Sequence, residues 1–243
     1  MPRASTMRHF IGRDNLGLVL TRRVEAGEFT HVLATNCAIQ LHTLSLKEVN
    51  AVFPLYLFHT DAGGLGIETR EPNLNPEIVA RVAEAIGGAP EPLALFDYVY
   101  ANLHAPDYRA RYQVFLKSDF PRVPVPSDKA AFKRLSAIGA RLRALLLLED
   151  ADAARCATYP ETGGNAVDKI RYEGGRVWIN GAQYFGNVSE RAWGFIVGGY
   201  QPAGKWLKDR VGRTLAYADI AHYARLIAAL DETAEIMETL MFK

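Results

Sequence analysis

The chain has 243 residues, a formal net charge of +1, 49% hydrophobic residues and 23% charged residues. This is the composition of an ordinary globular protein with enough residues for a sizeable core, and it excludes a disordered or fibrous chain. No apolar run approaches the ~18 residues that span a bilayer, and two distant cysteines exclude a disulfide scaffold, so we expect a cytoplasmic protein with no membrane partner.

The first part of the chain, residues 1–74, is expected to be rich in β-structure. Segments 16–24, 29–40 and 52–58 are apolar, contain many β-forming residues and are separated by glycine or polar residues. This pattern predicts short strands. The glycine-containing segment 59–66 predicts a loop after them.

A helical segment, residues 75–149, is expected next. Asn75 in the N-cap position, with Pro76 after it and Gly87 beyond the last apolar residue, predicts a helix between them. Pro92 and Pro106 predict the starts of two more helices, because proline is tolerated in the first turn.

The end of this segment is expected to change from extended chain to helix. Three prolines forbid a helix over 120–127. Ser127 is then expected to cap a long amphipathic helix that reaches about residue 149.

The last part, residues 150–243, is expected to contain a β-hairpin region, a basic loop and a C-terminal helix. Residues 168–180 predict a hairpin that turns at Gly174–Gly175, and the C-terminal helix should start near Asp219. The fold class is therefore α+β, with two β-containing regions flanking a helical middle segment, in one compact or two-lobed domain.

The segment GKWLKDRVGR, residues 204–213, carries four basic residues against one acidic residue. It has two interpretations, a solvated loop or a surface for an anionic partner. Residues 107–143 carry nine basic residues against three acidic ones, with aromatic residues between them. Such cations are what phosphate binding needs, although a solvated helix face has the same pattern.

Enzyme signatures are missing from the sequence. It has no P-loop, no G-x-S-x-G, no H-E-x-x-H and no paired histidines at metal-ligand spacing. We therefore expect no catalytic site and no metal site. A stand-alone enzyme with a site built from scattered residues, such as His59, Asp61 and His104, stays open as an alternative.

Five blocks that occur in order resemble a known family. They are VFPLYLF (52–58), PNLNPEIV (72–79), YVYANLHAPDYRARYQVFLKSDFPRVPVP (98–126), VWINGAQYFGNV (177–188) and GGYQPAGKWLKDRVGRTLAYADIAHY (198–223). Together they resemble the C-terminal target-recognition domain of type ISP and related single-chain restriction–modification enzymes. The resemblance extends from about Met7 to Leu230.

The resemblance implies a non-catalytic module that recognises double-stranded DNA. In that family a nuclease, a motor and an adenine-N6 methyltransferase precede the domain, so S-adenosylmethionine, ATP and Mg²⁺ would belong to those parts. The methyltransferase domain or subunit would be the protein partner. The chain is then expected to be a fragment, a separate specificity subunit or a gene remnant.

The resemblance also implies two kinds of DNA contact, because phosphate contacts position a protein and base contacts give it specificity. The residues expected to hold the DNA backbone are Lys205, Lys208, Arg210 and Arg213. The residues expected to read base edges are Arg22, Arg23, Asn180 and Gln183. Trp206 is expected to anchor the basic segment on the core. A module that docks on a methyltransferase without touching DNA remains an alternative.

Overall fold

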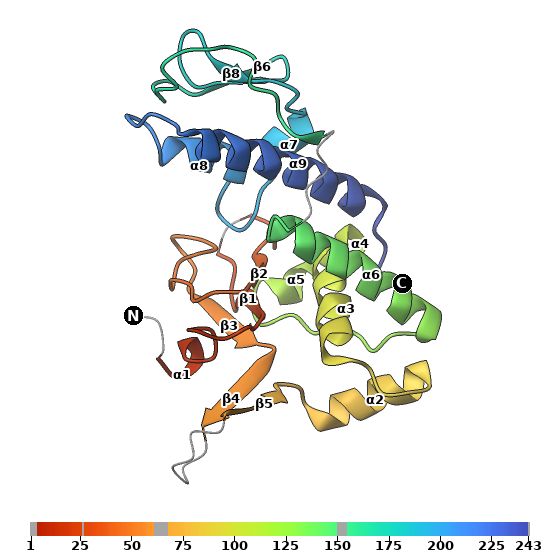
Figure 1. Cartoon of the computed structure of the whole chain (residues 1–243). Helices are drawn as coiled ribbons and strands as arrows, with labels where there is room; N and C mark the ends of the chain where they lie inside the picture. The colour runs from red at the N-terminus through yellow and green to blue at the C-terminus, as the bar shows by residue number, and fades with distance from the viewer. Residues whose placement is uncertain (1–3, 26, 61–67, 150–154, 243) are drawn as a thin grey trace. The chain divides into compact units, whose positions relative to one another are not determined.

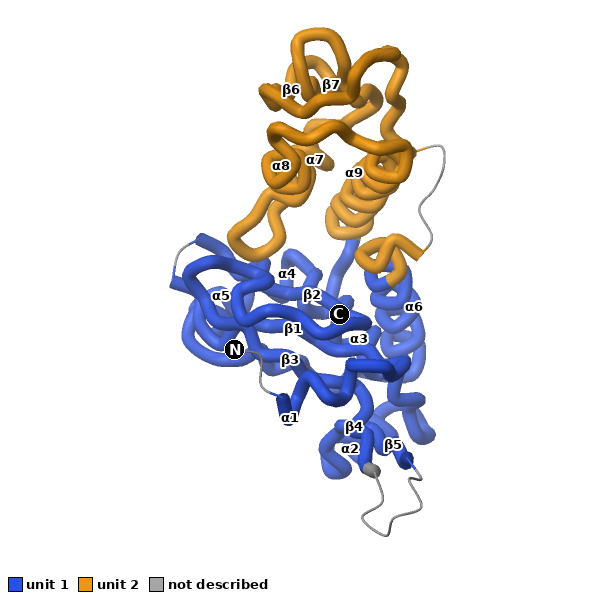
Figure 2. Tube along the Cα trace, turned by 60° about the vertical axis from the view of Figure 1, so that its left-hand side comes forward, with its two compact units in different colours: residues 1–143, 240–243 blue, residues 144–239 orange. Residues whose placement is uncertain are grey.

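The computed structural model describes residues 4–25, 27–60, 68–149 and 155–242. Helices and antiparallel sheets together form the chain, which confirms the predicted α+β class (Figure 1). The chain divides into two compact units (Figure 2). Unit 1 is Met1–Arg143 with Leu240–Lys243, and unit 2 is Ala144–Thr239.

The sheet of unit 1 has the strand order β2-β1-β3, and all its pairs are antiparallel. Strand β1 is Gly17–Thr21, β2 is Val32–Thr35 and β3 is Asn50–Pro54. A short helix, α1 (Ala4–Met7), precedes β1. The strands predicted in 16–24 and 29–40 are thus confirmed.

The single strand predicted over 52–58 is two strands that belong to different sheets. Strand β3 ends at Pro54, and β4 (Tyr56–Thr60) pairs with β5 (Glu68–Pro72) in a second sheet. The buried side chain of Asn15 causes the break, since its amide group donates to the carbonyl of Tyr56 and accepts from the same residue's N–H, at 2.9 and 3.1 Å. A continuous ladder would need those two groups.

Two further differences concern the region around the predicted loop 59–66. His59 and Thr60 lie in β4, whereas residues 61–67 are outside the described part of the chain. Strand β5 was not predicted. All its residues are exposed, so it has no apolar alternation from which a strand could be inferred.

The first three helices after β5 begin at the capping residue and prolines from which they were predicted. Helix α2 (Pro76–Ile86) begins after Asn75, whose side chain accepts from two backbone N–H groups, and ends at Gly87 in the left-handed region. Helices α3 (Pro92–His104) and α4 (Pro106–Arg111) both start at proline, and a short α5 (Gln113–Leu116) follows.

Helix α6 (Lys129–Leu146) confirms the predicted long helix but not its cap. The carboxylate of Asp128, rather than the hydroxyl of Ser127, accepts from the N–H groups of Ala130 and Ala131, both at 2.8 Å. A carboxylate also interacts more favourably with the helix dipole than a hydroxyl does.

Two tyrosines and one ion pair hold the helical part of unit 1 together. The hydroxyls of Tyr98 and Tyr108 donate to the carbonyls of Pro124 and Arg122, at 3.0 and 3.1 Å, and so fix the extended segment 120–127. Arg143 on α6 donates to Asp97 on α3 at 2.7 Å, where both side chains are largely buried.

The C-terminal tail returns to unit 1 after α9. The backbone N–H of Phe242 donates to the carboxylate of Asp107 at 3.1 Å, and its ring packs edge-on against Tyr108 and Tyr112. The Phe242 residue is 9% exposed, whereas its neighbour Met241 is 55% exposed. The side chain of Phe242 therefore packs into unit 1, whereas the side chain of Met241 is exposed.

Unit 2 combines a three-stranded sheet with three helices. Strands β6 (Arg171–Glu173), β7 (Arg176–Trp178) and β8 (Tyr184–Phe185) pair in that order, and Gly174–Gly175 forms the first turn with positive φ angles of 56° and 76°. The helices are α7 (Glu190–Gly194), α8 (Pro202–Lys208) and α9 (Tyr217–Thr239). The predicted hairpin and C-terminal helix are confirmed.

The core of unit 2 lies between the inner face of its sheet and α9. Its fully buried residues include Val177, Ile179, Phe185, Tyr223 and Ile227. At ~25 cal/mol per Å² of apolar surface removed from water, this cluster is the main source of the stability of unit 2.

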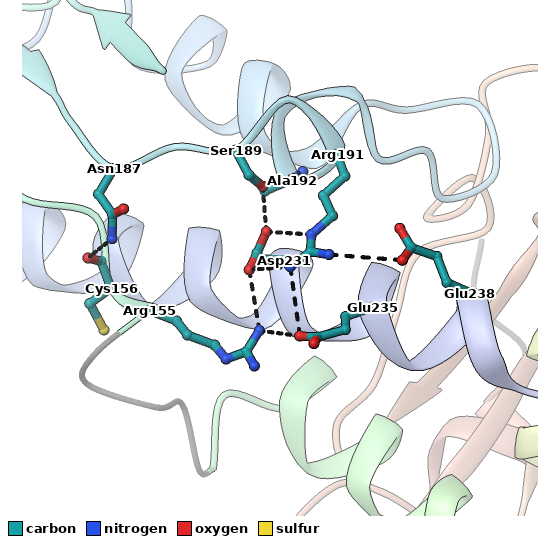
Figure 3. Close-up of polar contacts among 9 residues, drawn as sticks. All are labelled: Arg155, Cys156, Asn187, Ser189, Arg191, Ala192, Asp231, Glu235 and Glu238. Carbon is teal, nitrogen blue, oxygen red and sulfur yellow. Dashed lines mark hydrogen bonds and ion pairs between the residues drawn. The ribbon is translucent and has the colours of Figure 1, made fainter. Parts of the chain in front are cut away.

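An ionic network on α9 fixes two other segments of unit 2 (Figure 3). Asp231 accepts from Arg191 Nε at 2.8 Å, from the Ser189 hydroxyl and from Arg155 at 3.3 Å. Glu235 also binds Arg155. The hydrogen bond from Arg191 lowers the pKa of the Asp231 carboxyl below its usual value.

We expect Asp231→Asn to lower the free energy of unfolding of unit 2 by about 2 kcal/mol at pH 7, because the variant cannot make hydrogen bonds to a charged carboxylate. A carboxyl with a lowered pKa stabilises the fold above its ordinary value of 3.8, and this contribution disappears as the pH falls through the folded pKa. The difference in the free energy of unfolding between wild type and variant should therefore become smaller as the pH falls below 3.8. Urea titrations followed by tryptophan fluorescence measure it, since Trp178, Trp193 and Trp206 all lie in unit 2.

Glu238→Gln is the matched control. Glu238 lies 3.9 Å from Arg191 and its side chain is 63% exposed, so its removal should change the free energy of unfolding by less than about 0.5 kcal/mol. Equal effects of the two substitutions would contradict the assigned role of Asp231.

We expect Phe242→Ala to destabilise unit 1 by about 3 kcal/mol, the usual cost of removing a buried aromatic ring. Met241→Ala should have little effect, because that side chain is exposed. Amide hydrogen exchange resolved by peptide measures the reduced protection of α4, which contains Tyr108. If α4 is equally protected in both variants, the tail does not stabilise unit 1.

Candidate nucleic-acid interface

The basic segment 204–213 is not a loop over its whole length. Gly204 to Lys208 form the last five residues of α8, and only Asp209 to Arg213 form a turn. Gly204 favoured the interpretation as a loop, but it lies buried inside the helix. A Cβ there would lie 3.1 Å from the Gln201 side chain and 3.4 Å from Trp193, so the glycine permits close packing.

Two of the four cations in this segment have acidic partners. Lys205 Nζ lies 2.6 and 2.7 Å from the two carboxylate oxygens of Asp209, four residues later. Arg210 lies 3.7 Å from Asp219 and donates to the carbonyl of Trp206 at 3.0 Å. These contacts reduce the positive charge that the segment offers to a partner.

Lys208 and Arg213 are the other two cations. Both are exposed, and no ion pair or side-chain hydrogen bond joins either of them to another residue in the described part of the chain. Gly212, with a φ of 82°, turns the chain between these two cations. These two side chains carry the accessible charge of the segment.

Trp206 anchors the segment, as the sequence predicted. Its ring packs on Tyr223 in the core, with 5.3 Å between centroids, and stacks on His222. The guanidinium of Arg210 lies 3.5 Å from the centroid of the same ring. Burial, helped by the positive charge of Arg225, lowers the pKa of the His222 imidazole.

Gln183 is a structural residue, which corrects its assignment as a base reader. It is 2% exposed. Its amide oxygen accepts from Asn165 N–H and from the Asn180 amide, and its amide nitrogen donates to Glu161 O and Asn165 Oδ1. All its hydrogen-bonding capacity is used inside unit 2, so none is left for a base edge.

Asn180 is corrected for the same reason. Its side-chain oxygen accepts from the N–H groups of Ala182 and Gln183, at 2.9 and 2.8 Å. Its amide nitrogen donates to Ala166 O and Gln183 Oε1, at 2.9 and 3.2 Å. Asn180 therefore shapes the turn between β7 and β8, a common role of asparagine in turns.

Arg22 and Arg23 follow β1 in unit 1, and both are exposed. Arg22 Nε donates to Asp119 at 3.0 Å, with 66% of its side chain exposed. Arg22 also lines a hollow of about 630 Å³ beside β3, together with Phe53 and Phe120. The other residues predicted to contact DNA lie in unit 2.

The basic stretch 107–143 contributes less charge than its sequence suggests. Arg109 is half-buried and donates to Leu103 O at 2.7 Å, and desolvation of its guanidinium lowers the pKa to about 10. Arg143 pairs with Asp97, and Arg134 donates to Met241 O. Part of this stretch therefore supports the interior of unit 1.

The outer face of the β6–β7–β8 sheet was not predicted from the sequence as a candidate site. The residues that share this face are Arg171, Glu173, Arg176, Trp178 and Tyr184. Guanidinium and aromatic groups are in contact along it, with Arg171 over Trp178 and Arg176 over Tyr184. This face of arginine and aromatic residues could have been identified from the sequence RYEGGRVW, because every second residue of a strand points to the same face.

The scattered catalytic site considered from the sequence is not supported by the described residues. His104 is buried, donates to Tyr100 O at 2.9 Å and has its pKa lowered to about 3 by burial. His59 is half exposed beside Glu71, and Asp61 lies outside the described residues. Burial therefore favours the neutral imidazole of His104, and these observations place no catalytic pair beside it among the described residues.

Neither a metal site nor a membrane span occurs among the residues that the structure describes. Within them, no three His, Cys, Asp or Glu side chains are grouped so that they could hold a metal ion. None of the helices there is both long and apolar enough to cross a membrane.

Three solved structures share this fold. The cryo-EM structure of a DrdV–DNA complex has a TM-score of 0.72, 22% identity and 94% coverage of this chain. The structure of the ATP-dependent type ISP restriction–modification enzyme LlaBIII bound to DNA has a TM-score of 0.72, 16% identity and 94% coverage of this chain. The structure of a nuclease-deletion mutant of the type ISP restriction–modification enzyme LlaGI, in complex with a DNA substrate mimic, has a TM-score of 0.65, 19% identity and 94% coverage of this chain.

This chain spans 25%, 16% and 21% of the length of those three chains, respectively. A comparison with curated protein sequences gives no match. Residues 1–239 match the family described as the Type ISP C-terminal specificity domain, which is nearly the whole chain. The chain therefore belongs to the family of type ISP C-terminal specificity domains.

Proposed function

We propose that this specificity domain recognises a particular sequence of duplex DNA for a restriction–modification enzyme. The observation that carries the proposal is the match of residues 1–239 to the specificity-domain family. The DNA complexes of DrdV, LlaBIII and LlaGI, which share its fold, support it. The domain itself has no catalytic role in this proposal.

The activity of the parent enzyme would be supplied by other parts. These parts would be an adenine-N6 methyltransferase, a motor and a nuclease, which would use S-adenosylmethionine, ATP and Mg²⁺. The coverage supports this division of labour, since the chain corresponds to at most 25% of the length of each of the three structures. The domain would place those activities on the recognised site.

The end of α8 and the turn after it would hold the DNA backbone. Lys208 and Arg213 are exposed and carry charge that no acidic group among the described residues neutralises. Lys205 and Arg210 would contribute less, because Asp209 and Asp219 compete with phosphate for them. Arg22 and Arg23 remain candidates for base contacts from unit 1.

A second role, docking on the methyltransferase, is favoured by one observation on unit 1. Val114 and Phe115 on α5 are 77% and 71% exposed. Contiguous exposed apolar surface marks sites of protein–protein interaction, and these two large side chains are neighbours in the sequence. This role is compatible with DNA binding, because a recognition domain must also contact its catalytic partner.

We expect the double substitution Lys208→Ala, Arg213→Ala to weaken binding of the chain to all duplexes about equally. Removal of one phosphate-binding cation should reduce the magnitude of the slope of log K against log salt by about 0.9, so the double variant should reduce it by about 1.8. Fluorescence anisotropy with a labelled duplex of mixed sequence, between about 50 and 200 mM salt, measures both the affinity and the slope.

Two single variants are matched controls. Lys205→Ala should change the slope less than Lys208→Ala, because Lys205 is paired with Asp209. Asp209→Asn should strengthen binding, because it releases Lys205 and removes a negative charge. An unchanged slope in the double variant would place the phosphate contacts elsewhere, and failure of the wild-type chain to bind duplex DNA would refute the proposed function.

A further inference from the structure

The β6–β7–β8 sheet has two faces of opposite character. On the inner face Val177 and Phe185 lie directly opposite each other, and both are fully buried. On the outer face Trp178 lies opposite Arg171 on one side and Tyr184 on the other. The outer face is therefore a row of guanidinium and aromatic groups.

The contacts along this row are continuous. Arg171 lies 5.4 Å above the ring of Trp178, whose centroid is 4.7 Å from that of Tyr184. Arg176 lies 4.8 Å above the ring of Tyr184. Each ring limits the orientations of the guanidinium that it contacts, because a cation is attracted to the face of an aromatic ring.

The two arginines differ in what else they contact. Arg171 lies 3.4 Å from the carboxylate of Glu173. Arg176 is exposed, and its guanidinium makes no hydrogen bond or ion pair with any residue that the structure describes. The aromatic contact uses none of the N–H groups of Arg176, so these donors remain available.

Arg176 lies beside the turn of the β6–β7 hairpin. It pairs with Glu173 on β6, whereas the ladder with β8 involves only Val177 and Trp178. Next to Arg176 the chain turns at Gly174–Gly175, and the N–H of Val188 donates to the carbonyl of Gly175 at 3.0 Å. The hairpin therefore presents Arg176 near its tip, and the major groove of B-DNA is wide enough to admit a β-ribbon.

We propose that Arg176 is a specificity-determining residue that reads a guanine in the major groove. This inference rests on the proposed function, since it needs a DNA ligand. Guanine offers the acceptors O6 and N7 side by side, and a guanidinium whose orientations are limited by a ring can donate to both. Phosphate binding would need the charge alone, whereas the ring of Tyr184 adds orientation, which is what discrimination between bases requires.

Selection from a randomised duplex library with the wild-type chain tests this proposal. The selected sequences should contain one invariant G·C pair that depends on Arg176. Arg176→Lys keeps the charge but removes the planar pair of donors. It should lower discrimination at that position about tenfold to a hundredfold, while preferences at other positions and the salt slope stay unchanged.

Three control variants separate stacking from charge. Tyr184→Phe keeps the ring below Arg176 and should preserve the selected sequence. Tyr184→Ala removes the ring and should weaken the same G·C preference that Arg176→Lys weakens. Lys169→Ala removes an exposed cation from the same unit, and it should leave every preference unchanged.

Each negative result of these experiments has a different meaning. Unchanged preferences in Arg176→Lys together with a smaller salt slope in Arg176→Ala would show a phosphate contact and overturn the inference. No change in either variant would show that Arg176 does not face DNA, and would also overturn it. If the wild-type chain binds no duplex or selects no sequence, the proposed function fails as well.

Discussion

The arrangement of unit 2 depends on the buried amide of Gln183. Three of its four hydrogen bonds join the turn between β7 and β8 to the segment that contains Glu161 and Asn165, and the fourth, with Asn180, lies within the turn. The fit is tight, because a Cβ on Gly163 would lie 2.7 Å from the Gln183 side chain. Gln183 immediately precedes Tyr184, so the same bonds that close the turn also place the ring beneath Arg176. An outward-facing contact therefore depends on a polar group that never meets solvent.

The role of Gln183 could not be predicted from the sequence, although most of the elements around it could. Local signals were sufficient for them: a glycine pair predicted the hairpin, an Asn75 cap predicted α2, and prolines predicted the starts of α3 and α4. Whether an amide near a turn faces solvent depends on residues far away in the chain. Gln183 is bonded to Glu161 and Asn165, about twenty residues earlier. A turn asparagine or glutamine is therefore weak evidence for base reading.

Non-local contacts also explain the errors in secondary structure. The strand predicted over 52–58 is interrupted by Asn15, about forty residues earlier in the chain. Gly204 favoured a loop, but it lies in α8, where the Gln201 and Trp193 side chains pack closely over it. Local propensity is overridden in both places by a tertiary contact.

Formal charge overstates how many cations are available to a partner, because it counts cations without their acidic neighbours. Lys205 and Asp209 are four residues apart, so their pairing could have been inferred from helical spacing. The contact between Arg210 and Asp219 could not.

The partner of a cation also determines what the cation can do. An acidic partner neutralises an arginine and occupies its donors, as Asp231 does for Arg191. An aromatic ring restrains the guanidinium but leaves both its charge and its edge donors available. Tyr184 restrains Arg176 in this way. In a protein that must choose among DNA sequences, an arginine supported by a ring is therefore better suited to reading a base, whereas a free cation is sufficient for a phosphate.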